Sequence, residues 1–260
     1  MIRALLIRGM LAGLIAGMVA TVFAWFVGEP AIRDAISYEE GHDQAGAAHS
    51  HVAGASPHVH EAAESAVSRG VQETLGLSVA LALFGIAIGG IFALVFAGLH
   101  GRLGELTARP LSALLAGAGF VLVGLVPFTK YPANPPAVGH EDTIGSRTVS
   151  YLALITVSII AVVIATQTAR RLTARLGVWN ATLIGGGVFL VLVGIASITL
   201  PGFNEVPADY PAAVLWRFRI ASLATTAIIW TVLGLVFGAL AARVIDTSNT
   251  HSAMGVARSQ

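Results

Sequence analysis

The chain has 260 residues, of which 55% are hydrophobic and only 11% are charged, whereas a typical soluble protein has about 25% charged residues. The formal net charge of +1 excludes the strongly basic surface that nucleic-acid binding requires. The chain contains no cysteine, so disulfides, thiolate metal sites and iron–sulfur clusters are excluded as well. We therefore expect an integral membrane protein whose surroundings are the lipid bilayer.

Six charge-free stretches are long enough to cross a hydrocarbon core, which takes about 20 helical residues. In lipid every backbone amide needs an internal partner, so stretches of this length are expected to be helices. The predicted fold class is all-α, a polytopic transmembrane helical bundle of about six spans. In chain order the expected spans are 9–27, 75–99, 111–128, 149–169, 180–200 and 220–242.

Small residues recur four positions apart in three of these spans, the spacing that lets two membrane helices approach closely. They are Gly9, Gly13 and Gly17 in the first span, Gly85 and Gly89 in the second, and Gly234 and Gly238 in the sixth. We interpret them as packing positions within the bundle, with a dimer interface as the alternative.

The distribution of charge favours a cytoplasmic N-terminus. With that orientation nine of the 15 basic residues lie on the cytoplasmic side, as the positive-inside rule expects, and all but two of the acids lie outside. The expected location is the bacterial cytoplasmic membrane, with both termini in the cytoplasm. The expected domains are the first helix (1–27), an acidic outer loop (28–74), a membrane domain of five further helices (75–245) and a polar tail (246–260).

The loop 28–74 is far longer than a connection between helices requires, and it holds five of the chain's eight histidines. The candidate metal ligands are His42, His49, His51, His58, His60 and Glu64. The HSH and HVH pairs would each present two imidazoles on one side of an extended chain. On a helix beginning at Pro57, His60 and Glu64 would share a face. Imidazole and carboxylate suit Co²⁺, Ni²⁺ or Zn²⁺ and do not choose among them. A solvated tether and a pH-sensing segment are the alternatives.

An internal repeat joins two outer loops. FTKYPANPPA (128–137) matches FNEVPADYPA (203–212) at five of ten positions with an offset of 75 residues, so Asn134 corresponds to Asp209. Each copy follows the outer end of a span, which predicts parallel helical-hairpin repeats.

These two loops also collect the polar groups of the membrane domain. The outer candidates are Lys130, Asn134, His140, Glu141, Asp142 and Arg147 in the first, and Asn204, Glu205, Asp209, Trp216, Arg217 and Arg219 in the second. One interpretation is a vestibule that attracts divalent cations. The other is that the arginines pair with nearby acids and lock the loops together.

Several kinds of catalytic machinery are missing from the sequence. The only lysine, Lys130, is not part of a nucleotide-binding P-loop. Neither a GxSxG nucleophile elbow nor an HExxH zinc-protease motif occurs, and no span carries a carboxylate of the kind that often couples transport to protons. We therefore expect a protein that is not an enzyme and has no tightly bound cofactor.

Three segments resemble the CbtA family of probable cobalt transporter membrane subunits: EPAIRDAISYEE (29–40), KYPANPPAVGHEDTIGSRT (130–148) and LPGFNEVPADYPAAVLWRFRIASL (200–223). The first segment adds Glu29 and Glu39 to the outer candidates. The resemblance covers nearly the whole chain before residue 246. It implies a cobalt permease linked to cobalamin supply, which works with a small single-span partner of the CbtB type.

These observations lead to one main hypothesis, a membrane subunit of a divalent-metal uptake transporter, with Co²⁺ as the expected substrate and the histidine-rich loop as the site of capture. The alternative is a membrane-anchored metal-binding or sensing protein that does not itself move the metal.

Overall fold

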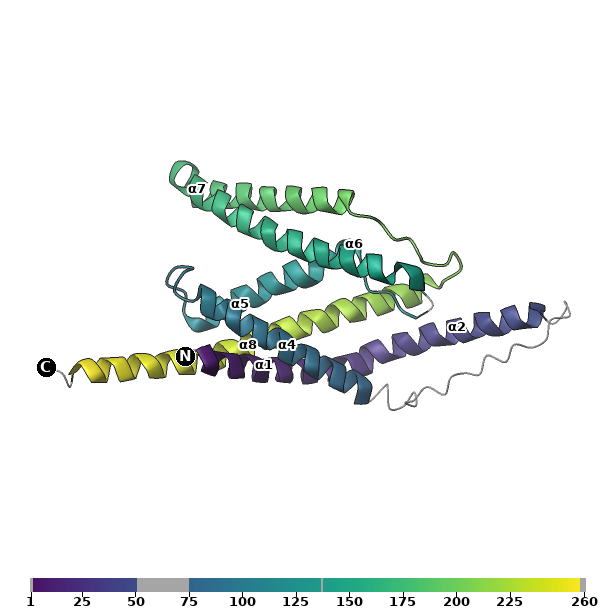
Figure 1. Cartoon of the computed structure of the whole chain (residues 1–260), viewed down its shortest axis with the longest axis horizontal. Helices are drawn as coiled ribbons and strands as arrows, with labels where there is room; N and C mark the ends of the chain where they lie inside the picture. Colours follow the sequence, from purple (N-terminus) through teal and green to yellow (C-terminus); the bar gives the residue numbers. More distant parts are fainter. Residues whose placement is uncertain (1, 51–74, 137, 258–260) are drawn as a thin grey trace. The chain divides into compact units, whose positions relative to one another are not determined.

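The computed structural model describes residues 2–50, 75–136 and 138–257, and all regular structure within them is helical (Figure 1). The predicted all-α class is therefore confirmed. The chain divides into two compact units, Met1–Gly119 with Ile220–Gln260, and Phe120–Arg219. Each unit is described by itself.

Five helices in the described part of the chain are long and apolar enough to cross a membrane: Ile2–Gly41, Leu77–Leu99, Ala108–Lys130, Glu141–Thr199 and Ala212–Ile245. The fourth has 59 residues and contains the expected span 149–169 and all but the last residue of the expected span 180–200. Because one crossing takes about 20 residues, its length suffices for two. Large apolar side chains project outward from the helices, for example Ile198, which is 85% exposed. Such exposure is typical of helices that face lipid and not water.

The first helix continues beyond the expected span. α1 (Ile2–Phe23) passes through a π-helical segment, η1 (Ala24–Gly28), into α2 (Glu29–Ser50). The segment expected as a loop from residue 28 therefore begins as a helix, on which Ala31 and Ala35, one turn apart, are fully buried.

Two π-helical segments, η1 and η3 (Phe120–Leu125), each end two residues before a proline. η1 precedes Pro30, and η3 precedes Pro127 in the short helix α6 (Val126–Lys130). A proline ring clashes with the carbonyl four residues earlier and offers no N–H to it. In both cases that carbonyl lies inside the π-helical segment, whose wider turn relieves the clash.

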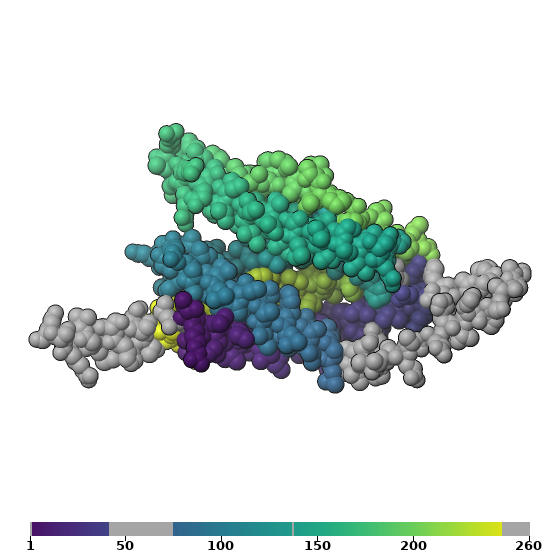
Figure 2. All heavy atoms as spheres, in the orientation of Figure 1, coloured from purple at the N-terminus to yellow at the C-terminus, as the bar shows by residue number. Residues whose placement is uncertain are grey.

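In the first unit α1 packs closely against α4 (Leu77–Leu99), and their atoms meet in Figure 2, where α1 is purple and α4 is blue. Gly9, Gly13 and Gly17 lie on the buried face of α1. A Cβ atom at Gly13 would overlap the carbonyl oxygen of Gly85, and one at Gly89 would overlap that of Gly9. Only glycine permits this approach, so the prediction that these residues pack within the bundle is confirmed.

Glycines of α8 (Ala212–Ala257) likewise allow this helix to approach α5 (Ala108–Gly119) closely. A Cβ atom at Gly234 would lie 2.5 Å from the Ala116 Cβ. The buried Ser112 hydroxyl donates a hydrogen bond of 2.7 Å to the Gly234 carbonyl, which joins the two helices across the close contact. Nearby, Phe237 packs edge-on against Phe92 and Phe96 in the core of this unit.

In the second unit α7 (Ile144–Thr199) reverses direction, as Figure 1 shows. The reversal lies at Gly177, which has φ 75° and ψ 165°, a region that only glycine adopts readily. Beyond the turn, a Cβ atom at Gly185 would lie 2.9 Å from the Ala165 carbonyl oxygen and 3.1 Å from the Ala169 Cβ. The two arms of α7 therefore pack against one another as a hairpin.

The first arm of α7 supplies hydroxyl groups to η3. The Ser158 hydroxyl lies 2.7 Å from the Leu122 carbonyl oxygen, and the Tyr151 hydroxyl lies 3.2 Å from that of Val123. Each of these carbonyls has lost one of its two possible backbone donors, because residue 127 is proline. The π-helical segment is thus held by side chains that lie some 30 residues further along the chain. The arm also packs through Leu154 on Val126 and Ala196.

Candidate functional site

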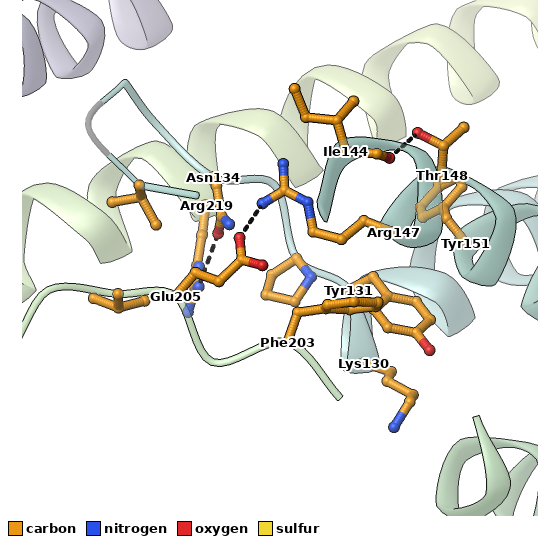
Figure 3. Close-up of a pocket in the computed structure, with 13 residues that line it drawn as sticks. Lys130, Tyr131, Asn134, Ile144, Arg147, Thr148, Tyr151, Phe203, Glu205 and Arg219 are labelled. Carbon is orange, nitrogen blue, oxygen red and sulfur yellow. Dashed lines mark hydrogen bonds and ion pairs between the residues drawn. The ribbon is translucent and has the colours of Figure 1, made fainter. Parts of the chain in front are cut away.

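A pocket of about 340 Å³ in the second unit, at the end of α6 and the start of α7, is lined by several charged and polar side chains (Figure 3). Its walls come from the loop after α6, the start of α7, the loop after α7 and the first two turns of α8. The lining residues are Lys130, Tyr131, Pro132, Asn134, Val138, Ile144, Arg147, Thr148, Tyr151, Phe203, Glu205, Val206 and Arg219.

The two repeated loops are joined beside this pocket. The Tyr131 hydroxyl donates a hydrogen bond of 2.7 Å to the Pro201 carbonyl, and the Tyr131 and Phe203 rings lie 6.0 Å apart. Each loop also closes a tight turn of its own, from Pro135 to the Val138 amide and from Pro207 to the Tyr210 amide. Because proline has a fixed φ angle and no N–H, these two loops have little conformational freedom where they line the pocket.

An ion pair crosses the pocket. Arg147 Nη1 lies 2.7 Å from Glu205 Oε2, and the Glu205 side chain is only 7% exposed. The same oxygen accepts a hydrogen bond of 3.1 Å from the His140 amide. Gly139 makes room for the pair: its φ is 118°, and a Cβ atom there would lie 2.5 Å from Arg147 Nη1. The backbone angle favours glycine, and a side chain at this position would also displace the Arg147 guanidinium.

The surroundings of Glu205 favour its ionised form. A hydrogen bond to the Thr143 side chain, the His140 amide and the Arg147 charge together hold the pKa of the Glu205 carboxyl below its ordinary value of 4.5. They outweigh desolvation, which by itself raises that pKa. The carboxylate is therefore committed to a structural ion pair at neutral pH.

The second arginine of the pocket is held differently. Arg219 Nη2 donates a hydrogen bond of 3.2 Å to the Asn134 amide oxygen. Its Nε is buried and has no hydrogen-bond partner among the described residues. The third cationic group, the Lys130 amine, lies 5.5 Å from the centre of the Tyr131 ring, and Figure 3 shows it pointing away from the Arg147–Glu205 pair.

The structure brings together five of the residues that the sequence predicted for the outer loops: Lys130, Asn134, Arg147, Glu205 and Arg219. The others do not line the pocket. Glu141 and Asp142 lie in the short helix η4 (Glu141–Thr143), and they are exposed together with His140, Asn204, Asp209, Trp216 and Arg217. On α2, Glu29 is 3% exposed and Glu39 is on the surface.

The histidine candidates lie mostly outside the described residues. His42 and His49 fall within the helical backbone of α2, seven residues apart, whereas an extended chain was expected around His49. The remaining candidates, His51, His58, His60 and Glu64, lie outside the described residues. Elsewhere in the described chain no three His, Asp or Glu side chains are placed to hold a metal ion.

Several pocket residues were not predicted. Tyr131 and Phe203 lie inside the repeated loops, so an aromatic residue within one or two positions of a proline was an available signal. Tyr151 lies in an apolar span, and nothing in its local sequence marks its place in the pocket. Gly139 lies outside the repeat, and its φ angle and its closeness to Arg147 became evident only in the structure.

The long apolar helices, their close glycine contacts and the polar pocket at the helix ends define a polytopic helical membrane protein. The family model described as probable cobalt transporter subunit (CbtA) matches residues 2–242. The chain belongs to this family, which confirms the resemblance seen in its motifs. No curated protein and no solved structure matches the chain.

Proposed function

We propose that the chain is the membrane subunit of an uptake transporter for a divalent transition metal, with Co²⁺ as its substrate. The main support for this proposal is the family match over residues 2–242, which begins with the first long apolar helix of the described chain and ends within the last. The proposed location is the bacterial cytoplasmic membrane, with both termini in the cytoplasm, and the proposed partner is a small single-span subunit of the CbtB type.

We further propose that the histidine-rich segment captures the metal before transport. Five histidines within 19 residues of an otherwise acidic segment supply ligands that suit Co²⁺, Ni²⁺ and Zn²⁺. α2 connects this segment to the membrane helix α1 without a break. The capture segment is therefore tethered by a helix to the translocating bundle. A ligand set of this kind raises the local metal concentration at the membrane surface.

The experiment is uptake of radiolabelled cobalt in cells that express the chain together with its small partner. Expression is expected to raise accumulation above that of cells carrying the partner alone. An unchanged rate would support the other function, a membrane-anchored metal-binding or sensing protein. Competition with unlabelled Ni²⁺ and Zn²⁺ in the same assay ranks the three metals.

A variant with glutamine at positions 42, 49, 51, 58 and 60 tests the capture segment. Its half-saturating cobalt concentration is expected to rise while the maximal rate stays the same, because capture acts before translocation. His251→Gln, in the C-terminal tail, is the matched control and should leave both values unchanged. A loss of maximal rate in the five-histidine variant would assign these residues to translocation itself.

A further inference from the structure

The pocket of the second unit has the wrong charge for a bare metal cation. Three of its lining residues are cationic, Lys130, Arg147 and Arg219, and only Glu205 is anionic. That carboxylate already accepts hydrogen bonds from Arg147 and from the His140 amide. A divalent ion entering here would meet two guanidinium groups and would have to displace one of them from its partner. Coulomb repulsion at these distances opposes its binding.

The same arrangement leaves donors available for an anion. A guanidinium group carries five N–H donors in a planar fork. Arg147 uses Nη1 for Glu205, and Arg219 uses Nη2 for Asn134. The Nε of Arg219 is buried with no partner among the described residues, and a buried charged donor without a partner destabilises a protein. An acceptor supplied by a ligand would remove this cost.

The shape of the pocket also fits a small ligand. Its volume of about 340 Å³ lies at the lower end of the range of small-molecule sites. The aromatic residues Tyr131, Tyr151 and Phe203 line it beside the two arginines. The Tyr131 hydroxyl is already bonded to the Pro201 carbonyl, and the Tyr151 hydroxyl to the Val123 carbonyl. The tyrosines therefore offer a ligand the apolar surface of their rings, and the arginines offer positive charge.

We propose that this pocket is a binding site for an oxyanion, a phosphate or carboxylate group held by the guanidinium groups of Arg147 and Arg219. Arginine forks match the planar oxygen pairs of these groups and bind them through charge-assisted hydrogen bonds. Two sources present this chemistry, the phosphate of a lipid headgroup and a soluble phosphate or carboxylate compound. The proposal does not depend on which metal the protein transports, because its test measures binding.

The test uses the full chain purified in a maltoside detergent and stripped of phospholipid. Thermal unfolding is followed while inorganic phosphate, citrate or cobalt chloride is added at constant ionic strength, because added salt alone would change electrostatic interactions. A ligand that binds only the native state raises the Tm, so at least one of the two anions is expected to do so if the source is soluble. Any shift caused by cobalt chloride is expected to be the same with and without Arg219.

In the second arm, phosphatidylglycerol is added to the stripped protein and bound lipid is counted by native mass spectrometry. Lipid retention that depends on Arg219 would assign the oxyanion to a headgroup. An Arg219-dependent effect of phosphate or citrate without lipid retention would assign it to a soluble compound. Either result supports the site.

Three variants make the test specific. Arg219→Gln is expected to lower anion affinity about tenfold or more, the effect of losing a charge-assisted hydrogen bond. Arg175→Gln removes the same charge from an exposed position on α7 that does not line the pocket, and it should bind like the wild type. If Arg219→Gln does not fold, Arg219→Lys replaces it, because lysine keeps the charge but loses the Nε donor. Equal binding by the wild type and the Arg219 variant in both arms would overturn the proposal.

Discussion

The Ser158 hydroxyl lies 2.7 Å from the backbone carbonyl oxygen of Leu122, 36 residues earlier in the chain. Ser158 is fully buried, and the carbonyl belongs to the π-helical segment that precedes Pro127. The proline removes one of the backbone donors that could have reached this carbonyl. The Ser158 hydroxyl also lies 2.8 Å from the Ile155 carbonyl oxygen in its own helix. Because an unpaired carbonyl within a membrane is costly, we interpret Ser158 as a donor that supports the backbone of the neighbouring π-helical segment.

Replacing Ser158 by alanine should therefore destabilise the second unit. We expect a loss of about 1–3 kcal/mol, the cost of leaving a buried polar group without its partner, measured by thermal unfolding in detergent. Thr156→Ala is the matched control, because the Thr156 hydroxyl is exposed and bonds only to Leu152 in its own helix. Equal effects of the two substitutions would show that the Leu122 carbonyl does not need the Ser158 donor.

The contact between α1 and α4 should be equally sensitive to a single methyl group. At Gly13 an added Cβ would overlap the Gly85 carbonyl oxygen, so Gly13→Ala must push the helices apart. Overpacking of this kind costs about 1–3 kcal/mol, which a fall in Tm would reveal. Gly98→Ala, also in this pair of helices, has no atom within 4 Å of the added Cβ. It should be neutral or slightly stabilising, since alanine is the better helix former.

Much of this architecture could be predicted from the sequence, because the membrane imposes a simple rule. Apolar stretches without charge must become helices, and all six expected spans lie in long helices of the described chain apart from one or two residues at the ends of two spans. The glycine spacing likewise predicted which faces pack. Both signals are local: each depends on residues within one helix and on the period of that helix.

The features that were missed depend on residues far apart in the chain. The π-helical segment η3 needs donors from Tyr151 and Ser158, and Pro127 alone does not identify them. General pairing of arginines with acids was one of two interpretations, yet Arg219 bonds to the amide of Asn134 and not to a carboxylate. The repeat aligned Asn134 with Asp209, but only Asn134 lines the pocket. Sequence similarity of the loops therefore does not give them equivalent contacts.

The spacing of two alanines in the sequence could have predicted helix α2. Acidic composition marked residues 28–74 as an outer loop, but Ala31 and Ala35 are spaced by one helical turn and both are buried. Such spacing indicates an amphipathic helix. The many charged residues of the segment made the helical spacing of its apolar residues hard to recognise.

The reversal of α7 leads to a third prediction. Gly177 has backbone angles that a residue with a side chain adopts only with strain, so Gly177→Ala should destabilise the hairpin by about 1–3 kcal/mol. Gly145→Ala, in the same helix, adds a Cβ to open space at an ordinary φ angle, and no loss of stability is expected there. The comparison is made by thermal unfolding in one detergent, and a stable Gly177→Ala protein would show that the turn tolerates another conformation.

The Arg147–Glu205 pair should make stability depend on pH in a defined direction. Because the pKa of the Glu205 carboxyl in the folded protein lies below its ordinary value of 4.5, the unfolded state binds the proton more readily. The stabilisation is therefore fully present above about pH 4.5, and it is lost as the pH falls through the lowered pKa of the folded state. Plots of Tm against pH for the wild type and Glu205→Gln should be separated at neutral pH and should converge in acid. Glu141→Gln is the control, because it removes an exposed carboxylate outside the pair. Its plot of Tm against pH should run parallel to that of the wild type over the same range. If the plot for Glu141→Gln also converged with that of the wild type in acid, general protonation and not this ion pair would cause the acid sensitivity.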